Sequence, residues 1–162
     1  MEAGIADTRD IRIREAGGSD WDQAMLLAYQ TFLQFDAPDY TAEGIENFRR
    51  FVSDEELRKL FIAGSYQLFV ASLHGQIIGM LSLREKKHIS LLFVDSRFHR
   101  NGIGAALIRY ACSYAEADHG EKRVTVNASP YATDFYLRIG FRKLGTEMTA
   151  DGIRFTPMEI RF

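Results

Sequence analysis

Residues 88–119 constrain the fold more than any other stretch of this 162-residue chain. An apolar run ends at Val94, a short polar and basic segment follows, and Gly102 and Gly104 then flank a single isoleucine. Apolar residues next recur at helical spacing until Gly120, so the stretch predicts a strand, a turn and a helix. Because glycine lowers helix propensity by about 1 kcal/mol relative to alanine, the pair indicates that something approaches the backbone where this helix begins.

The glycine-bearing turn has two interpretations. The first N–H groups of a helix lack intrahelical partners and lie at the positive end of its dipole, so the turn predicts a phosphate-binding cradle. Arg97, His99 and Arg100 add positive charge beside it. Alternatively, the glycines allow the helix to pack closely on the sheet. Two known phosphate motifs are excluded, because Leu107 replaces the third small residue of a dinucleotide fingerprint and no Gly-Lys-Ser/Thr sequence occurs.

The remaining elements follow from periodicity and turn residues. Strands are expected at residues 10–15, 66–73, 76–84, 88–94, 122–127, 141–149 and 153–161. Helices are expected to begin at Ser19, at Thr41, in the capping box 53–56 and at Ser129-Pro130. The first helix has an apolar face formed by Trp21, Met25, Ala28 and Phe32. This order of elements predicts a mixed α/β fold.

Composition limits the other possibilities. The chain is 46% hydrophobic and 26% charged with a net charge of −2, which gives no general reason to expect nucleic acid or a membrane as partner. We expect one domain over residues 9–162 after a tail at 1–8. Cys112, the single cysteine, excludes an internal disulfide and is most simply a small core residue. Since the histidines lack metal-ligand spacing and no secretory signal is evident, we expect a cytoplasmic protein without a metal.

Two segments resemble the motifs of one family. Residues 92–104, LFVDSRFHRNGIG, resemble the acetyl-CoA-binding motif of the GNAT N-acetyltransferase superfamily, in which a strand leads through (Gln/Arg)-x-x-Gly-x-(Gly/Ala) into a helix. Residues 129–141, SPYATDFYLRIGF, resemble the family's Ala-x-x-(Leu/Phe)-Tyr-x-x-x-Gly-Phe segment. The resemblance covers residues 10–162 and implies a mixed, mostly antiparallel central sheet of about seven strands flanked by helices. The chain departs from the common family residues at Ser96, His99, Arg100 and Ser129.

The resemblance implies acetyl-CoA as the cofactor and a set of residues that hold it. The amides from Arg100 to Ala105 match the pyrophosphate site, and the backbone of residues 92–94 should pair with pantetheine like an added strand. Either Asn127 or Ser129 should meet the pantetheine arm. The full expected set is Leu92, Phe93, Val94, His99, Arg100, Asn101, Gly102, Ile103, Gly104, Ala105, Asn127, Ser129 and Tyr136.

Catalytic roles also follow from the resemblance. The Leu92 amide matches the donor to the oxyanion. Tyr136 matches the general acid, and an ordinary phenol pKa near 10 would let it hold a proton at neutral pH and deliver it to sulfur. His88 stands where some members carry a glutamate, and its ordinary pKa of about 6.5 suits a general base. The alternatives are that His88 is an inert, hydrogen-bonded residue, or that Glu85 or a water molecule is the base.

The acceptor site should be formed by the helices after the first strand, where Phe32, Phe35, Asp36 and Tyr40 bring aromatic and acidic side chains together. This mixture suits a cationic amine, although ordinary amphipathic helices show the same pattern. We expect an acetyl-CoA-dependent N-acetyltransferase in which a primary amine, on a small molecule rather than a protein, attacks directly. The alternatives are a protein or peptide N-acetyltransferase and a non-catalytic acyl-CoA-binding module. Family members often dimerise, so a homodimer is one arrangement to test.

Overall fold

The computed structural model describes residues 10–162, so the expected tail at 1–8 lies outside the described residues. The strands are β1 (Ile11–Glu15), β2 (Tyr66–Leu73), β3 (Gln76–Arg84), β4 (His88–Val94), β5 (Arg123–Ala128), β6 (Arg142–Lys143), β7 (Met148–Ala150) and β8 (Ile153–Arg161). The helices are α1 (Trp21–Phe35), α2 (Ala42–Val52), α3 (Glu55–Ile62), α4 (Ile103–Ser113) and α5 (Thr133–Ile139). Short helical turns are η2 (Gly18–Asp20), η3 (Ala37–Asp39), η4 (Ser96–Phe98) and η5 (Tyr114–Asp118).

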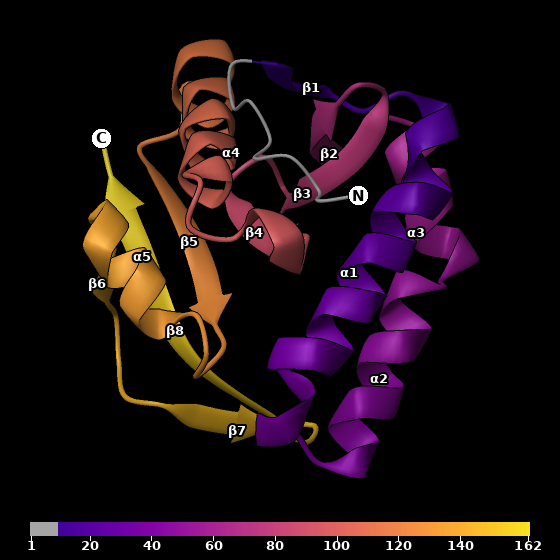
Figure 1. Cartoon of the computed structure of the whole chain (residues 1–162). Coiled ribbons are helices and arrows are strands. Elements are labelled where there is room, and N and C mark those ends of the chain that lie inside the picture. The colour runs from indigo at the N-terminus through magenta and orange to yellow at the C-terminus, as the bar shows by residue number, and fades with distance from the viewer. Residues whose placement is uncertain (1–9) are drawn as a thin grey trace.

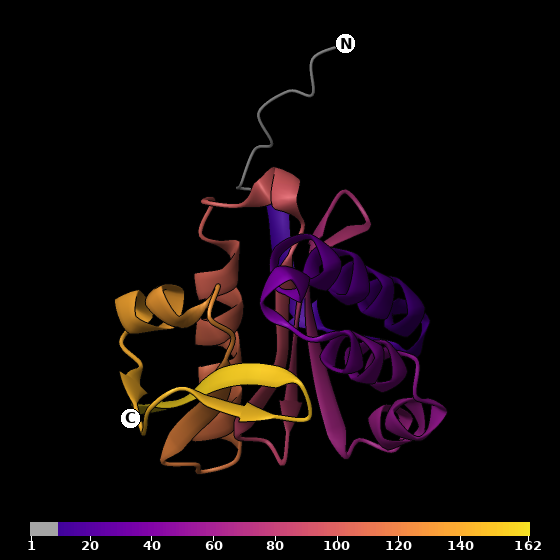
Figure 2. The ribbon, with the colours of Figure 1, turned by 90° about the horizontal axis from the view of Figure 1, so that it is seen from below.

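The sheet is the middle of three layers, with α1, α2 and α3 on one face and α4 and α5 on the other (Figures 1 and 2). The strands follow the order β1-β2-β3-β4-β5-β8-β6, and β7 pairs with β8. All pairs are antiparallel except β4–β5, so the mixed, mostly antiparallel sheet flanked by helices is confirmed. Within residues 10–162, no helix has the length and apolar content needed to cross a membrane.

The sheet divides into two arms at the β4–β5 pair. These strands are in register only at His88↔Thr125 and Ile89↔Val126, and they separate beyond these residues. We call β1–β4 with α1, α2 and α3 the first arm, and β5, β6, β7 and β8 with α5 and the loop before it the second arm (Figure 1). A gap therefore opens between the arms along the later half of β4.

A β-bulge interrupts β4 where the arms begin to separate. Ser82 pairs with Leu91, but the next residue of β3, Leu83, pairs with Ile89. Ser90 is therefore an extra residue on β4, and such an insertion reverses which edge of the strand each later residue faces. The bulge consequently decides which backbone groups of β4 point into the gap.

Two apolar cores lie on opposite faces of the sheet. The larger core packs α4 and α5 against the sheet and includes Leu107 and Met158, which are both fully buried. Cys112 packs against this core, as expected. The second core lies beneath α1 and contains Trp21, Met25 and Ala28 of the apolar face expected for this helix. Phe32, the fourth residue of that face, is also buried. Packing of amphipathic helices on both sides of an apolar sheet therefore holds the three layers together.

The start of α5 differs from expectation. Ser129-Pro130 was expected to begin this helix, but the helix begins at Thr133 and Ala132 is its N-cap. The Ser129 carbonyl accepts hydrogen bonds from the amides of Ala132 and Thr133 at 3.0 and 3.1 Å, which makes a turn before the helix. The Ser129 hydroxyl donates to Asp36 on the other arm and is thus not used as a cap.

Two smaller differences concern α3 and the last strands. Asp54, not Ser53, caps α3, and its carboxylate accepts from the amide two residues on at 2.9 Å. The Ser53 hydroxyl instead donates to the Arg49 carbonyl at 2.6 Å and closes the end of α2. The strand expected at 141–149 is split into β6 and β7, because the register against β8 shifts by two residues between them.

The β7–β8 hairpin joins the second arm to α2 on the first arm. Its turn consists of Asp151 and Gly152, which have φ values of 53° and 77°. The Gly152 carbonyl accepts from the Thr41 amide at 3.2 Å, and the Asn47 side chain donates to the Asp151 carbonyl at 3.2 Å. A Cβ on Gly44 would overlap the Gly152 carbonyl, so the turn can approach α2 only because Gly44 lacks a side chain. This contact closes one end of the gap.

Candidate active site

A cavity of about 1020 Å³ occupies the gap between the arms. It brings together nearly all of the expected site residues, namely Phe32, Phe35, Asp36, Tyr40, His88, Leu92, Phe93, Val94, His99, Arg100, Gly102, Ile103, Gly104, Ala105, Asn127, Ser129 and Tyr136. Asn101 does not line it, because its side chain turns back to donate to the carbonyls of Phe98 and His99 at 3.1 and 3.3 Å. In residues 10–162 no cluster of three or more His, Cys, Asp or Glu side chains could hold a metal ion.

The bulge directs backbone groups of β4 into this cavity. Before the bulge, the carbonyl of Lys87 faces β5 and accepts from the Thr125 amide at 2.9 Å. After it, the Asp95 amide faces β3 and donates to a carbonyl there at 2.8 Å. Because neighbouring residues of a strand direct their N–H and C=O groups to opposite edges, Leu92 and Val94 present theirs to the gap. An extended ligand could pair with this edge as an added strand.

His99 ties the end of β4 to α1. Its Nε2–H donates to the Val94 carbonyl at 2.7 Å, and its ring lies 4.9 Å from the ring of Phe35. One lone pair of the Val94 carbonyl is thus in use, while both backbone groups of Leu92 face the cavity. His99 therefore shapes the cavity, whatever contact it makes with a ligand.

The N-terminus of α4 supplies amides at another wall. The first hydrogen bond of the helix runs from the Ala106 amide to the Gly102 carbonyl at 3.0 Å, so the amides of residues 103–105 precede the helical ladder. Gly102 has a φ of 76°, which favours glycine, and a Cβ on Gly104 would lie 2.9 Å from Cζ of Phe135. Backbone conformation and close packing of α5 therefore explain the two glycines. An anion here would be bound by the amides of residues 103–105, not through the glycines themselves.

Tyr136 lies in the cavity wall on α5 and is only 4% exposed. Its ring packs edge-on against Phe135 and Phe141, with centroids 5.3 and 5.1 Å away. Burial raises the pKa of this phenol, and the negative charge of Asp36 raises it further. Tyr136 consequently carries its proton at neutral pH and could donate it to a group in the cavity.

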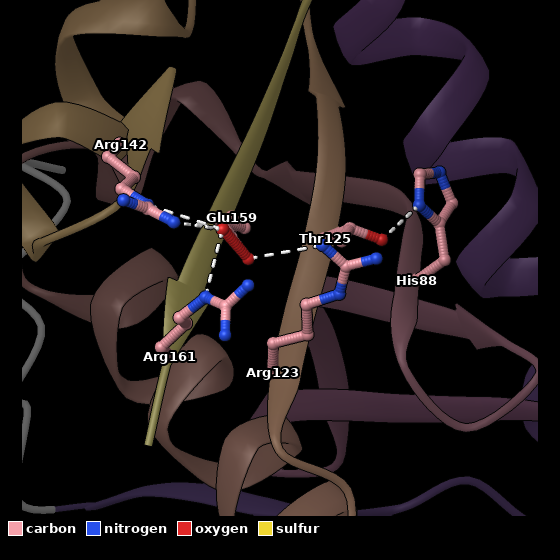
Figure 3. A network of polar contacts seen from close by, with 6 residues as sticks. All are labelled: His88, Arg123, Thr125, Arg142, Glu159 and Arg161. Atoms are coloured by element: carbon pink, nitrogen blue, oxygen red, sulfur yellow. Dashed lines mark hydrogen bonds and ion pairs between the residues drawn. The ribbon is translucent and has the colours of Figure 1, made fainter. Parts of the chain in front are cut away.

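His88 lines the cavity at the start of β4, and its Nδ1 lies 2.7 Å from Oγ1 of Thr125 (Figure 3). Burial and the positive charge of Arg84 lower the pKa of His88 to about 4, although Glu85 opposes them. The imidazole is therefore neutral at pH 7 and a weaker base than an ordinary histidine. Glu85, the alternative base, is exposed in the β3–β4 turn and is not among the cavity's lining residues. Thr125 carries no sequence signal, because only the β4–β5 register places it beside His88.

Asp36 ends α1 and is buried, with 8% of its surface exposed. Its Oδ1 accepts a hydrogen bond from the Ser129 hydroxyl at 2.9 Å, which links the two arms across the cavity. Burial raises the pKa of Asp36 to about 6; the Ser129 bond opposes this change and the charge of Asp39 adds to it. Burial raises the pKa values of Tyr136 and Tyr40, and the negative charge of Asp36 raises both further.

Aromatic rings form much of the wall near Asp36. Phe32 packs edge-on against Tyr40 at 5.0 Å and stacks on Phe48 at 3.8 Å. Phe35 stacks on Tyr131 of the other arm at 5.2 Å. Sequence analysis missed Tyr131, although its place directly after Ser129-Pro130 in a loop was the available signal.

Comparison with known proteins agrees with this arrangement. Residues 36–162 match the family model described as an acetyltransferase (GNAT) domain. The uncharacterized N-acetyltransferase YafP of Escherichia coli strain K12 is 27% identical over 154 residues, which cover 94% of this chain and 96% of that protein. A GCN5-related N-acetyltransferase from Rhodopseudomonas palustris has the same fold, with a TM-score of 0.80, 24% identity, and coverage of 93% of this chain and 95% of that one. PaiA N-acetyltransferase from Thermoplasma acidophilum, solved with coenzyme A, has a TM-score of 0.78 and 21% identity. The match covers 94% of this chain and 99% of that one. Because the family model matches most of its length, this chain belongs to the GNAT family and is an acetyl-CoA-dependent N-acetyltransferase.

Proposed function

We propose that the protein transfers the acetyl group of acetyl-CoA to a primary amine of a small molecule by direct attack, with both substrates bound together. One observation carries the proposal: a single cavity extends from the α4 amides, along the gap-facing edge of β4 and past Tyr136, to the buried Asp36. An anionic cofactor and an amine can therefore occupy it at the same time. Its volume is close to the upper end of small-molecule sites, and the β7–β8 hairpin limits its width, which favours a small acceptor.

The described residues fit acetyl-CoA, which supplies the acetyl group as an activated thioester. The amides of residues 103–105 and the Arg100 side chain suit its diphosphate, and the gap-facing edge of β4 suits the amides of pantetheine. Asn127 and Ser129 both line the cavity, but the Ser129 hydroxyl is engaged by Asp36. Asn127 is accordingly the side chain that we assign to pantetheine. The Thermoplasma relative was solved in complex with coenzyme A, which supports the identity of the cofactor.

Two groups of the chain act on the thioester. The bulge turns the Leu92 amide into the cavity, where it donates to the carbonyl oxygen as negative charge develops there. Tyr136 holds its proton at neutral pH and donates it to the departing sulfur. The same apolar wall raises both the pKa of Tyr136 and the basicity of a departing thiolate, so burial of the phenol does not by itself prevent the transfer.

The test compares Tyr136→Phe with Tyr131→Phe, the same chemical change at an exposed tyrosine of the same cavity. Thiol release from acetyl-CoA is measured over a panel of primary amines, and binding of acetyl-CoA is measured by the rise in melting temperature. Tyr136→Phe should lower kcat about 10²–10⁴-fold and leave acetyl-CoA binding intact. Tyr131→Phe should change neither quantity appreciably.

Three outcomes would contradict parts of the proposal. Binding of acetyl-CoA without turnover of any amine would indicate a non-catalytic module. Turnover of peptide N-termini or lysines alone would exclude the small-molecule acceptor. Unchanged kcat in Tyr136→Phe at every pH would remove Tyr136 as the acid.

A further inference from the structure

We propose that Asp36 receives the ammonium group of the acceptor and takes a proton from it, so that the acceptor is a positively charged primary alkylamine. This inference rests on the proposed function and adds to it the charge of the substrate and the identity of the proton acceptor. Asp36 lies outside residues 92–104 and 129–141, the two motif segments, yet it lines the same cavity as Tyr136.

Asp36 is a buried acid that no cation of residues 10–162 pairs with. Its single side-chain hydrogen bond within residues 10–162 comes from the Ser129 hydroxyl, and no ion pair forms there. Asp39, three residues later, is half-exposed and lies 3.6 Å from Arg154. A buried carboxylate is costly unless it is paired, and a single neutral donor compensates little of that cost. An ammonium group entering the cavity would supply the positive charge that the Asp36 carboxylate lacks.

The groups that face Asp36 make this part of the cavity negative. Asp39 of η3 brings a second negative charge, which Arg154 of β8 offsets in part at 3.6 Å. Tyr40 after η3 and Tyr136 of α5 bring phenols. From the β4–α4 turn, His99 packs on Phe35 and bonds to β4. Burial and Asp39 raise the pKa of Asp36 to about 6, against the bond from Ser129. Asp36 is therefore mostly ionised at pH 7, yet it is a stronger base than an ordinary aspartate.

Aromatic rings close to Asp36 would bind the rest of such a substrate. The packed group of Phe32, Tyr40 and Phe48 continues to Phe93 on β4, whose ring lies 5.8 Å from that of Phe48. Aromatic faces attract cations and also cover the methylene groups of an alkyl chain. An acid surrounded by such rings is suited to an alkylammonium ion.

Asp36 is also better placed than His88 to act on the reacting amine. The amine must meet the thioester between the Leu92 amide and Tyr136. His88 precedes Leu92 by four residues, roughly 13 Å along an extended strand. Asp36, in contrast, accepts a hydrogen bond from Ser129, whose carbonyl accepts from the Thr133 amide at the start of the helix that carries Tyr136. Burial also leaves His88 a weak base.

The protons balance in this assignment. One proton passes from the ammonium group to Asp36, and the neutral nitrogen forms its bond to the acetyl carbon as the carbon–sulfur bond breaks. Tyr136 gives its proton to the sulfur, and the second proton of the nitrogen restores the phenol. Asp36 then releases its proton to solvent, so the products are the amide, the free thiol and one proton.

The experiment compares Asp36→Asn with Asp39→Asn, the same change of charge three residues away. Primary alkylamines, which are ammonium ions at pH 7, are compared with arylhydrazines, which are mostly neutral at that pH. Asp36→Asn should lower kcat/KM at least 100-fold for alkylamines and only a few-fold for arylhydrazines. Asp39→Asn should change neither by more than a few-fold, and Asp36→Glu should retain more alkylamine activity than Asp36→Asn. In the wild type, kcat/KM for alkylamines should rise with pH through about 6, and Asp36→Asn should lose that step.

The outcomes separate this inference from the proposed function. If acetyl-CoA does not raise the melting temperature, or the wild type acetylates no amine, the proposed function fails. If the wild type is active but Asp36→Asn lowers both substrate classes equally, Asp36 only holds the arms together and the inference is overturned. Unchanged alkylamine activity in Asp36→Asn, or wild-type activity on arylhydrazines alone, would overturn it as well.

Discussion

Among the described residues, two carboxylates are buried in opposite surroundings. Glu159 on β8 is 1% exposed and meets the guanidinium groups of Arg142, Arg161 and Arg123 at 2.7, 3.1 and 3.2 Å (Figure 3). Hydrogen bonds from these arginines, Arg142 first, lower the pKa of Glu159 to about 2. Asp36 meets one serine hydroxyl, and burial raises its pKa to about 6.

The difference separates a carboxylate that joins strands of the fold from one that we propose receives a ligand. The arginines around Glu159 come from β5, β6 and β8, so this one acid joins three strands of the second arm. The three positive charges of these arginines exceed the single negative charge of Glu159, so this carboxylate is fully paired. Asp36 sits between the arms with its charge unmet, where an incoming cation can reach it. Burial alone therefore says little about a carboxylate's role, whereas its partners say a great deal.

The largest expected effect on stability comes from Glu159→Gln. This change keeps the shape of the side chain but leaves three guanidinium groups facing one another, so the melting temperature at pH 7 should fall by roughly 5–10 °C. Asp36→Asn, measured beside it by thermal unfolding, should not lower the melting temperature. Equal losses from the two variants would erase the distinction between the two acids.

The pH dependence of stability should also differ between the two acids. The pKa of Asp36 is raised from 3.8 to about 6, so the native state gains stability as pH falls through this window, by roughly 3 kcal/mol. The pKa of Glu159 is lowered from 4.5, so its stabilisation is present above 4.5 and is lost only as pH falls towards 2. Urea unfolding at a series of pH values should therefore show rising stability from pH 7 to 5.

Asp36→Asn provides the control for this prediction. The rise between pH 7 and 5 should disappear in that variant and persist in Glu159→Gln. A wild type whose stability does not change between pH 7 and 5 would show that Asp36 already has an ordinary pKa, and the contrast with Glu159 would lose its basis.

A change at Gly44 tests whether the closed cavity maintains the state of Asp36. In Gly44→Ala the new Cβ would overlap the Gly152 carbonyl and push the β7–β8 turn away, at a cost of about 1–3 kcal/mol in urea unfolding. Water would then reach the cavity more easily, so the pKa of Asp36 should fall. Gly18→Ala is the matched control, because a Cβ there meets no atom within 4 Å. If the step in kcat/KM near pH 6 stays in place, the hairpin does not control the burial of Asp36.

The smallest effect is expected from Arg142→Gln. Glu159 would keep its bonds to Arg123 and Arg161, and a mostly exposed guanidinium group contributes only about 0–1 kcal/mol. Changing Arg142 and Arg161 together should cost more than the sum of the two single changes, measured by urea unfolding. Strict additivity would mean that the arginines act independently and that Glu159 is not a shared centre.

Local patterns allowed much of the first arm to be predicted. The bounds of β2, β3 and β4 agree with expectation, because continuous or alternating apolar residues end at clear turn residues. The apolar face of α1 is buried for the same reason. The turn before α4 was also recognisable, since a strand, two glycines and a helix follow one another within one short segment. These features depend on residues that are neighbours in the sequence.

Features that join distant residues could not be predicted in this way. Asp36 was expected in the acceptor site from composition alone, and nothing nearby distinguishes it from Asp39. What distinguishes it is the bond to Ser129, 93 residues later, which depends on how the arms close. The bulge at Ser90 also has no recognisable sequence signal, although it decides that the backbone of Leu92 faces the cavity. Gly104 is the opposite case, because its presence in the sequence suggested a phosphate site, whereas in the structure Phe135 packs where its Cβ would lie.

The contact between Gly44 and Gly152 has a consequence for the order in which the protein assembles. The β7–β8 hairpin is made after every other element described here, and it docks on a helix formed more than a hundred residues earlier. Because contacts between residues so far apart carry a large loop-closure cost, the end of the cavity beside Gly152 should be the last part to close. The cavity is therefore complete only after residues 150–155, several of which line it, have been made.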